Sequence, residues 1–533
     1  MSKRREIVDS RGRVWAIAKV AWNEAEKPLK SQGAEAYHLS EPGAMALAQA
    51  GRVVARSERQ KGGTTMVRLR ISSFVGALVL FGCAASSGAE CRFLRVGCAE
   101  GVAPENLAIR SDELGQIFLE FDTLDLHNYV IQDADWLWPS PAWETVRTVV
   151  GDGKRSAWLT TRTWSRTFAG ACYEGARSVQ QTSDGGYIVV GKTRYWGPTP
   201  NDVYVLKTDG RGREQWSATF GGPEPDAYAA YSVRQTRDGG YIIAGETVRR
   251  SVYADVYLIK TDGRGHEEWS TTFGGDRRDV AYCVRQTSDS GYVLAGETWS
   301  FGAGSVDAYL IKTDSEGNEE WSRTFGGVNT DCAFWVQQTS DGGFVLAGYT
   351  YSFGGPGADV YLIKTDSQGK EEWSRTLGGA GHDWAFWVDQ TADGGYIVAG
   401  GTESFGAAPE QAYLLKTDSR GKQEWSKTFG TPQDKERACC AHRTSDGGYV
   451  LTGSRTSTAD GWSDVYLVKT DSRGQEEWSR TFGGYWDDHG WSVQETSDGG
   501  YIVAGETVSF GNPIAVYLIK TDRYGNAPAV PED

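Results

Sequence analysis

The chain has 533 residues, with 55 Lys+Arg against 70 Asp+Glu, and so carries a formal net charge of −15. This length allows one large domain with an extension. The acidic excess argues against nucleic acid as a partner, because phosphates need a basic surface. Eight cysteines in so long a chain do not make a disulfide scaffold.

Residues 1–65 differ in charge from the rest of the chain. Up to Arg70 the chain holds 14 Lys+Arg and 7 Asp+Glu, net +7, which leaves 41 against 63, net −22, for the remainder. The next segment, residues 66–83, has the pattern of a secretory signal, and such signals stand at the N-terminus of a protein. We therefore expect Met66 to be the true start and residues 1–65 to be absent from the mature protein. The codons of Lys61, Gly62 and Gly63 test this, because they can encode a ribosome-binding site.

Residues 66–83 have the order of a bacterial lipoprotein signal. A short basic segment (VRLR) precedes an apolar run over residues 71–81, which is too short to span a bilayer. The sequence LFGC that ends at Cys83 resembles a lipobox and predicts Cys83 as the lipidated first residue of the mature chain. A buried helix with a chance cysteine is the alternative. We expect a protein at the cell envelope or extracellular surface that touches the membrane by its lipid anchor only.

Residues 84–156 show no repeat and end in the sequence DWLWPSPAW. We expect a tether that becomes a partly ordered segment. Cys91 and Cys98 lie in it and can pair in an oxidising compartment.

Residues 157–533 are dominated by an internal repeat. Three signatures recur at steps close to 52 residues: a Trp-Ser pair, an aromatic after Asp-Gly-Gly (once Asp-Ser-Gly), and Lys-Thr-Asp. The tryptophans are Trp164, Trp216, Trp269, Trp321, Trp373, Trp425 and Trp478. Periods of this length with several short strands per unit are typical of propellers and solenoids.

One unit predicts four strands in a single sheet. Residues 333–339, 344–350, 360–365 and 371–377 are β-prone and are separated by a glycine hairpin turn, a loop and an Asp-x-x-Gly turn. The strands are apolar at consecutive positions, as in VYLI, so both faces of each sheet should be covered. Lysines at one position of every repeat, Lys207 to Lys520, should run along a blade edge or pair with Glu on the fourth strand.

The chain ends decide between ring and solenoid. Residues 161–168 form a fourth strand without a third before it, and residues 516–522 form a third strand without a fourth after it. The two ends complement each other, whereas a solenoid needs distinct caps. We predict an all-β, seven-bladed propeller of four-stranded antiparallel blades, closed by the N-terminal strand. Such a ring has no need of a partner, so we expect a monomer.

The segment YLIKTDSQGKEEWS resembles the repeat of quinoprotein-like propellers and is similar to the aspartate-box turn of sialidase propellers, with the tryptophan one residue further on. The whole pattern DGGYIVAG…YLIKTD…W resembles repeats of secreted or surface-anchored bacterial and archaeal proteins, over residues from about 160 to 525. The resemblance implies the fold and leaves the activity open.

Acidic residues recur where each first strand begins. Six of the seven repeats carry one, and blade two has Tyr228 there instead; the acids are Glu174, Asp279, Asp331, Asp383, Glu436 and Asp488. They predict an acidic ring at one rim of the channel, able to hold a cation or a basic ligand. The alternative is that each acid accepts backbone hydrogen bonds in the turn before its strand.

Aromatic residues vary between repeats beside that ring. The candidates for a ligand-binding rim are Trp196, Trp299, Trp335, Trp387, Trp462 and Trp486. Aromatic faces with acidic neighbours suit sugar rings and peptides, and packing between blades is the alternative for the residues in strands.

Cys439 and Cys440, with His442, break the repeat, since neighbouring repeats read AFWVQQT at this place. Adjacent cysteines form a disulfide in some quinoprotein dehydrogenases, but the rest of such a site is missing and drift at two packing positions explains the pair. The sequence predicts no cofactor, no metal site and no catalytic residue.

We therefore expect a non-enzymatic propeller scaffold that binds an extracellular carbohydrate, protein or peptide. Regular repeats support this, because a catalytic site needs different groups at different places. One alternative is a carbohydrate-active hydrolase that uses rim carboxylates such as Asp331 and Asp383 as acid and base. A quinoprotein-like oxidoreductase is the third hypothesis.

Overall fold

The computed structural model describes the side chains of residues 163–528 and 531, apart from 170–172, 194–201, 222–227, 249–252, 407–408 and 512–513, and only the strand backbone before residue 160. The elements in these regions are all strands, and no helix among them is long and apolar enough to cross a membrane. The chain divides into two compact units. The second comprises Thr163–Thr496 and Gly500–Asp533 and contains the repeats.

The N-terminal unit contains three sheets with strand orders β1-β2, β13-β10-β9-β6-β5 and β12-β11-β8-β7-β4-β3. The strands are β1 (Arg5–Val8), β2 (Val14–Ile17), β3 (Ala34–His38), β4 (Ala44–Gln49), β5 (Val53–Arg59), β6 (Thr65–Ile71), β7 (Leu78–Gly82), β8 (Arg92–Cys98), β9 (Glu105–Ser111), β10 (Ile117–Asp122), β11 (Asn128–Ala134), β12 (Glu144–Val150) and β13 (Arg155–Leu159). Cys83 and all side chains before residue 163 lie outside the described residues. The start at Met66, the lipid anchor and the Cys91–Cys98 pairing therefore stay predictions.

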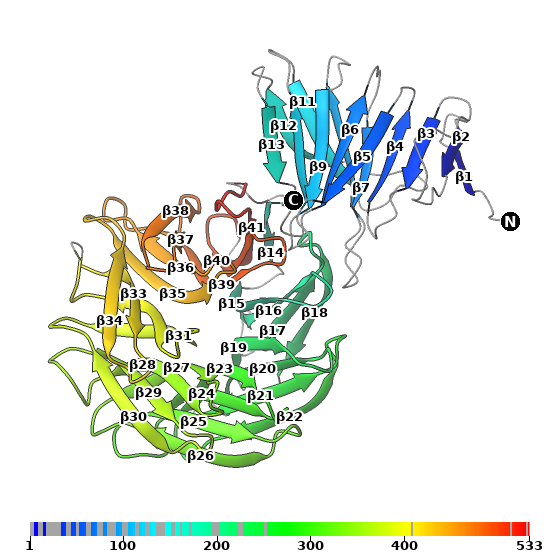
Figure 1. Cartoon of the computed structure of the whole chain (residues 1–533). Helices are drawn as coiled ribbons and strands as arrows, with labels where there is room; N and C mark the ends of the chain where they lie inside the picture. The colour runs from blue at the N-terminus through cyan, green and yellow to red at the C-terminus, as the bar shows by residue number, and fades with distance from the viewer. Residues whose placement is uncertain are drawn as a thin grey trace. The chain divides into compact units, whose positions relative to one another are not determined.

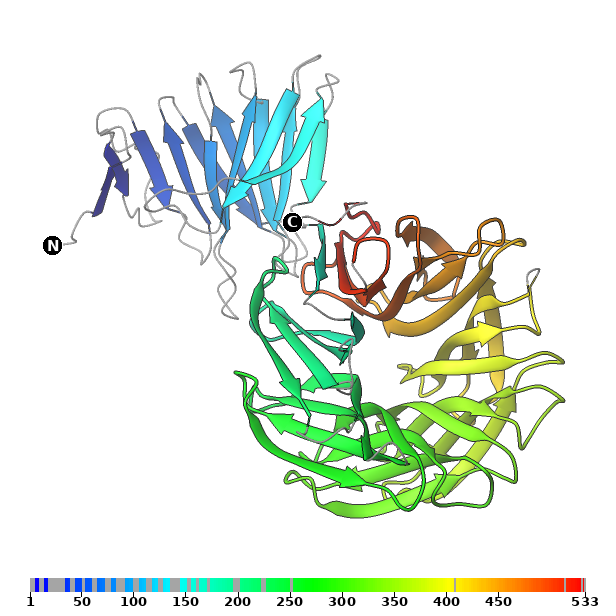
Figure 2. The same cartoon turned by 180° about the vertical axis from the view of Figure 1, so that it is seen from behind.

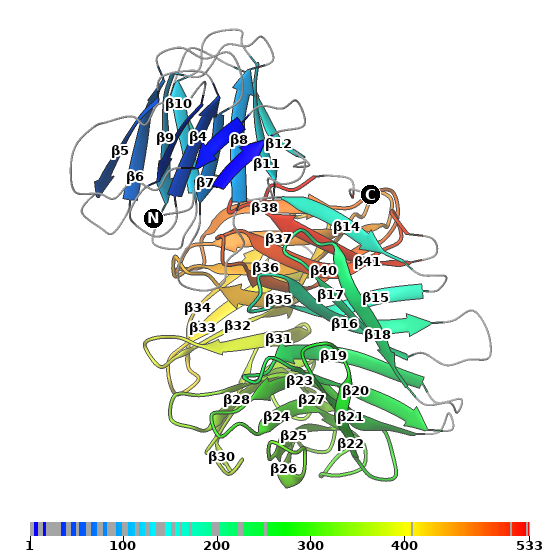
Figure 3. The same ribbon diagram turned by 90° about the vertical axis from the view of Figure 1, so that its right-hand side faces the viewer.

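The second unit is a ring of seven four-stranded antiparallel sheets, seen from two opposite sides in Figures 1 and 2 and from a third side in Figure 3. The inner strands are β15 (Tyr173–Gln181), β19 (Ala227–Gln235), β23 (Asp279–Gln286), β27 (Asp331–Gln338), β31 (Asp383–Gln390), β35 (Lys435–Arg443) and β39 (Asp488–Glu495). The second strands are β16 (Tyr187–Arg194), β20 (Tyr241–Arg249), β24 (Tyr292–Thr298), β28 (Phe344–Thr350), β32 (Tyr396–Thr402), β36 (Tyr449–Thr456) and β40 (Tyr501–Thr507).

The third strands are β17 (Asp202–Thr208), β21 (Tyr253–Thr261), β25 (Asp307–Thr313), β29 (Asp359–Thr365), β33 (Gln411–Thr417), β37 (Ser463–Thr470) and β41 (Ala515–Thr521). The outer strands are β18 (Glu214–Phe220), β22 (Glu267–Phe273), β26 (Glu319–Phe325), β30 (Glu371–Leu377), β34 (Gln423–Phe429), β38 (Glu476–Phe482) and β14 (Trp164–Phe168). The second and third strands are buried almost throughout, as their consecutive apolar residues predicted.

The ring closes as predicted. β14, the first strand of the second unit, pairs antiparallel with β41, with Trp164 opposite Lys520 and Phe168 opposite Val516. The seventh blade has the order β14-β41-β40-β39, so it is built from both ends of the repeat region. This confirms the seven-bladed propeller.

The repeat signatures meet where one blade packs on the next. The Trp216 ring of the first blade lies 6.0 Å from the Tyr241 ring of the second. Gly265, in the Asp-x-x-Gly turn of the second blade, has a φ of 82°, and a Cβ there would lie 2.6 Å from the Trp216 ring. Only glycine suits both the backbone conformation and the close approach. The signatures therefore share one period because they form one interface.

Every inner strand carries a β-bulge, which the sequence did not predict. In the fourth blade the register shifts between Ala333 and Trp335, and Phe334 is the extra residue. The bulge brings the Cys332 carbonyl against Gly348 of β28, where any Cβ would overlap that oxygen. A bulge redirects the side chain that it carries. Here it links the blades, because the Phe334 ring lies 5.1 Å from Tyr282 and 4.9 Å from Phe386.

The lysine at the end of each third strand is buried, and in five blades it pairs with a Glu of the outer strand, as predicted; in the first blade Lys207 contacts Gln215 instead. Lys364 is 3% exposed and reaches both Asp341 of the hairpin turn and Glu372 of β30, each at 3.0 Å. The same triangle occurs around Lys260, Lys312, Lys416 and Lys469. The amines do not run along an exposed blade edge.

Candidate functional site

The propeller has two chemically different faces. The hairpin turns between first and second strands, and those between third and outer strands, lie on what we call the turn face. The loops between second and third strands, and the connections between blades, lie on what we call the loop face. All inner strands begin at the loop face and end at the turn face. From Asp331 to Gln337 the distance along β27 is about 20 Å, at roughly 3.3 Å per residue.

The acids of the predicted ring lie at the loop-face end of the inner strands, where most of them accept hydrogen bonds from the neighbouring turns. Asp331 is fully buried, and its carboxylate accepts hydrogen bonds from the Gly327 amide at 2.7 Å and the Ser352 hydroxyl at 2.6 Å. Equivalent bonds reach Asp279, Asp383 and Asp488. Glu436, also fully buried, accepts from the Thr431 amide at 2.9 Å, and Glu174 is 8% exposed. The structure thus gives Asp279, Asp331, Asp383, Glu436 and Asp488 the turn-stabilising contacts of the alternative interpretation.

The loop face also carries exposed aromatic residues. Trp299 is 45% exposed and Trp486 is 44% exposed, and the ring of Trp462 packs edge-on against Trp486 at 4.7 Å between centroids. Trp196 lies outside the described residues. The predicted rim tryptophans Trp335 and Trp387 are not here.

Trp335 and Trp387 instead line the channel near the turn face. Their ring centroids are 6.4 Å apart, and Trp387 is 4% exposed. Ser178, Ser232, Cys283, Cys440 and Ser492 hold the equivalent inner-strand position in the other blades. At this position the channel wall therefore carries a bulky apolar side chain in the fourth and fifth blades only.

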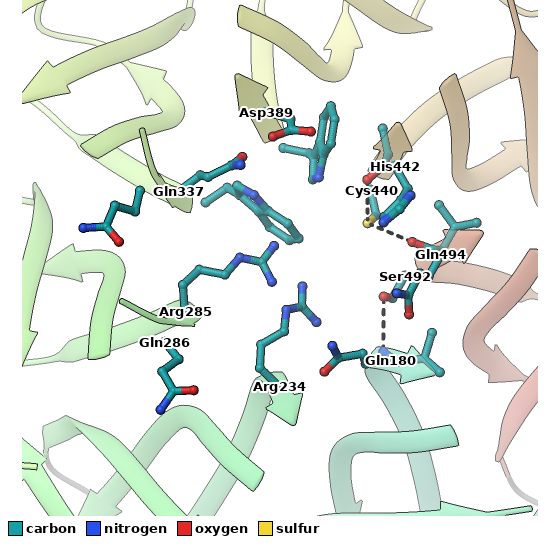
Figure 4. A pocket seen from close by; sticks show the side chains of 16 residues that line it. Gln180, Arg234, Arg285, Gln286, Gln337, Asp389, Cys440, His442, Ser492 and Gln494 are labelled. Carbon is teal, nitrogen blue, oxygen red and sulfur yellow. Dashed lines mark hydrogen bonds between the residues drawn. The ribbon is translucent and has the colours of Figure 1, made fainter. Parts of the chain in front are cut away.

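A ring of seven unlike residues surrounds the turn-face end of the channel. Each inner strand contributes one residue at the same register, opposite the second residue of its neighbouring strand: Gln180, Arg234, Arg285, Gln337, Asp389, His442 and Gln494. All seven line one cavity of about 380 Å³, together with Trp335 and Trp387 (Figure 4). We call this cavity the channel mouth.

The two arginines of the channel mouth have no carboxylate partner within ion-pair distance in the described part of the chain. Arg234 donates to the carbonyl of Val233 at 2.8 Å, and its guanidinium lies 5.6 Å from the Trp335 ring centroid. The Arg285 guanidinium stacks over the same ring at 4.3 Å. Figure 4 shows both side chains pointing into the channel. Burial lowers the pKa of Arg234, but an arginine stays charged in proteins.

The remaining polar groups divide the mouth into two halves. The amide oxygens of Gln180 and Gln494 accept the backbone N–H groups of Gln235 and Gln181, each at 2.7 Å. A backbone N–H can only donate, so the NH₂ ends of both amides remain available as donors. The first, second, third and seventh blades therefore present donors.

The opposite half of the mouth contains acceptors. Burial raises the pKa of Asp389, whose carboxylate accepts a hydrogen bond from Gln337. Burial also lowers the pKa of His442; a hydrogen bond with the Arg443 backbone opposes this shift and the nearby Arg234 adds to it, and the lowered pKa favours the neutral imidazole. His442 Nδ1 is buried without a hydrogen-bond partner among the described residues.

Cys439 and Cys440 are separate thiols in this structure, and Cys440 lines the channel mouth. Burial raises the pKa of Cys439 to about 12, which favours the protonated thiol at neutral pH. No group of three or more His, Cys, Asp or Glu side chains suited to a metal ion occurs among the residues with described side chains.

One column of the repeat indicates the channel mouth in the sequence, although the sequence analysis did not identify it. The seven residues occupy one column of the repeat, two places before a threonine in every blade, and only there do amide, cation, anion and imidazole alternate. The residue directly before this position is Val in six blades and Ala in one, whereas the position two residues before it also varies, between Ser, Cys and Trp. Residues at both variable positions line the cavity, so variation within the repeat indicates the residues that face the channel.

No family model and no curated protein matches this chain. Solved structures with some likeness include Sqt1 from Chaetomium thermophilum, with 12% identity over 69% of this chain and 88% of that chain and a TM-score of 0.41. A mutant of NanB sialidase from Streptococcus pneumoniae has 10% identity over 92% of this chain and 95% of that chain, with a TM-score of 0.37. A mutant of puromycin hydrolase has 14% identity over 73% of this chain and 57% of that chain, with a TM-score of 0.38. Similarity this low says nothing about activity.

Proposed function

We propose that this protein is a non-enzymatic binding propeller of the cell envelope or extracellular surface, which holds a carbohydrate or peptide ligand on its loop face. The distribution of exposed apolar side chains carries the proposal. Of the ten large ones that are strongly exposed in the described residues, nine belong to connections or strand ends at the loop face: Tyr253, Trp299, Phe301, Val328, Tyr351, Phe353, Phe405, Tyr485 and Trp486. Clustered exposed apolar residues mark interaction surfaces.

The fold holds these residues rather than leaving them loose. Phe301, Phe353 and Phe405 each pack against a tyrosine of the third strand of their own blade, with centroids 5.8 to 6.0 Å apart. Tyr351 contacts the ring of His382, which stacks on Trp384. Rigid aromatic side chains bind sugar rings and peptide side chains at a low entropic cost.

A glycan and peptide array probed with the full chain tests the proposal. Replacing Trp299 and Tyr351 by alanine should weaken binding to any array ligand about tenfold or more, because each aromatic anchor contributes upward of about 1 kcal/mol. The matched control is Tyr524→Ala, which removes a ring that is 58% exposed on the turn face. Equal affinity in the double variant, or equal loss in the control, would contradict a loop-face site.

A carbohydrate-active hydrolase is the alternative function. Its predicted acid and base, Asp331 and Asp383, are both fully buried and hydrogen-bonded to the turns. A panel of hydrolase substrates distinguishes this function from binding. Hydrolysis by the natural chain that is lost in Asp331→Asn and Asp383→Asn would favour the hydrolase over the binding propeller. The array variants would not separate the two functions, so both experiments are needed.

A further inference from the structure

We propose that the channel mouth is a second binding site, which takes a small hydroxyl-bearing organic anion such as a sugar acid or a sugar phosphate. The site lies at the opposite end of the channel from the loop face, so it does not depend on the function proposed above. It rests on three features of the cavity: two cations without a carboxylate partner in the described residues, a donor half facing an acceptor half, and an apolar wall.

The arginines carry the charge argument. Two guanidiniums stack on one indole, which holds like charges near each other, with no carboxylate of the described residues within ion-pair distance of either. A desolvated, unpaired charge is costly in a folded protein. The protein carries a net charge of −15 and has 70 acidic residues, so a neutralising carboxylate was available to the sequence. Arginines held in this way complete their coordination with an anion from solution.

The indole also fixes the direction of the arginines. Stacking on Trp335 restrains both guanidiniums, so less side-chain entropy is lost when they bind a ligand. The planar fork of a guanidinium matches the two oxygens of a carboxylate or phosphate group. With the amide donors of Gln180 and Gln494 in the neighbouring blades, one arc of the mouth offers donors only.

The opposite arc requires a ligand with hydroxyl groups. The Asp389 carboxylate and the unpartnered Nδ1 of His442 can accept hydrogen bonds from hydroxyls, whereas a simple inorganic anion would offer them nothing. Trp335 and Trp387 cover the wall between the two arcs and suit the carbon skeleton of such a ligand. The cavity of about 380 Å³ accommodates a molecule of the size of a monosaccharide.

The repeat itself supplies a mild substitution for the test. Gln180, Gln337 and Gln494 occupy the ring position in three other blades, so Arg234→Gln and Arg285→Gln introduce a residue that this backbone position already accepts. The matched control is Arg323→Gln on β26, which also removes a guanidinium stacked on a tryptophan, at 5.3 Å from the Trp321 ring, but on an outer strand.

Titration calorimetry on the full chain measures binding with four probes: glucuronate, glucose 6-phosphate, inorganic phosphate and neutral glucose. We expect millimolar or tighter binding of glucuronate, glucose 6-phosphate or both, and none of glucose. Each single Arg→Gln variant should lose about tenfold, as expected for a charge-assisted hydrogen bond, and the double variant should show no binding. Arg323→Gln should bind like the natural chain.

Each other outcome overturns the inference. Binding of glucose with equal affinity would remove the role of charge, and binding of inorganic phosphate alone would remove the role of the acceptor arc. Failure of all four probes at millimolar concentration in the natural chain needs no variant and is equally decisive. The melting temperature of the double variant checks folding, and its loop-face ligands on the array should be unaffected.

Discussion

Ser290 is the one residue other than glycine with a left-handed backbone in the described part of the chain, at a φ of 74°. It stands where the hairpin turns of other blades have a glycine, as at Gly239 and Gly342. Its hydroxyl accepts a weak hydrogen bond from the exposed Arg237 at 3.3 Å. The third blade therefore carries a local strain that the sequence difference Asp-Ser-Gly already indicates.

Replacing Ser290 by glycine should stabilise the propeller. A left-handed backbone costs a residue with a Cβ about 1–2 kcal/mol. Glycine avoids this cost, but it loses more backbone entropy on folding, which offsets about 0.5–1 kcal/mol of the gain. We expect a net gain of about 0.5–1 kcal/mol, visible as a higher midpoint in urea. The control Ser290→Ala removes the hydroxyl but keeps the Cβ. A gain in both variants would show that the hydroxyl, not the backbone, is the cause.

At the scale of the element, a buried lysine and its two acids join three parts of the blade in five of the seven blades. Burial alone would raise the pKa of Asp341, but hydrogen bonds from Thr339 and Lys364 lower it to about 2. In the next blade, a hydrogen bond from Thr391 is the main reason why the pKa of Asp393 is about 2. Both values lie below the ordinary 3.8, so these carboxylates bind protons more weakly in the folded protein than in the unfolded one.

This sign predicts how stability depends on pH. The contribution of Asp393 is complete above about pH 4 and is lost as the pH falls toward about 2, because the unfolded state takes up the proton first. Asp393→Asn should therefore flatten the decline of melting temperature over this window. The control Asp276→Asn makes the same change in charge at an exposed carboxylate without an ion pair in the described residues. An unchanged slope in Asp393→Asn would exclude the triangle as an acid-sensitive contact.

The elements also show what the sequence could predict. Strand number, order and ring closure follow from hydrophobic runs, turn glycines and the complementary chain ends, and all three are local or repeated features. The bulge at Phe334 does not follow, because it depends on the close approach of Cys332 to Gly348 across two strands. The missed bulge matters for the site, since it changes which inner-strand residues face the channel.

The candidate site was harder to predict than the fold. The acids at the strand starts are visible in the repeat, but their distance to the turn amides cannot be read from spacing. Arg234 and Arg285 belong to different blades, and only the ring brings both to Trp335. Sites that depend on several blades require the tertiary arrangement.

At the scale of the whole molecule, the seventh blade depends on five paired residues of β14. Trp164 is 1% exposed, and its indole nitrogen donates to the Gly210 carbonyl of the first blade at 3.3 Å. Trp164→Ala should destabilise the propeller by about 3–5 kcal/mol. Because β14, alone among the described propeller strands, is held to its blade without a hairpin on either side, it should also detach, and limited proteolysis should cut between residues 163 and 173.

The comparison is Trp425→Ala, the same change in β34, which a hairpin joins to β33. It should lower stability without opening a new cleavage site near Trp425. Cleavage at both places would mean that the loss of packing, rather than the split seventh blade, exposes the chain.

The inner strands keep one register in all seven blades, so the residue at the ring position can change while the fold of the blade stays the same. Four kinds of side chain already share the ring position, and the blades around them are alike. A protein engineer could thus rewrite the channel by changing seven letters of the chain, one per blade, and tune its charge in steps of one. The same property gives natural variation a short route to new ligands, since a single codon alters recognition without disturbing the frame.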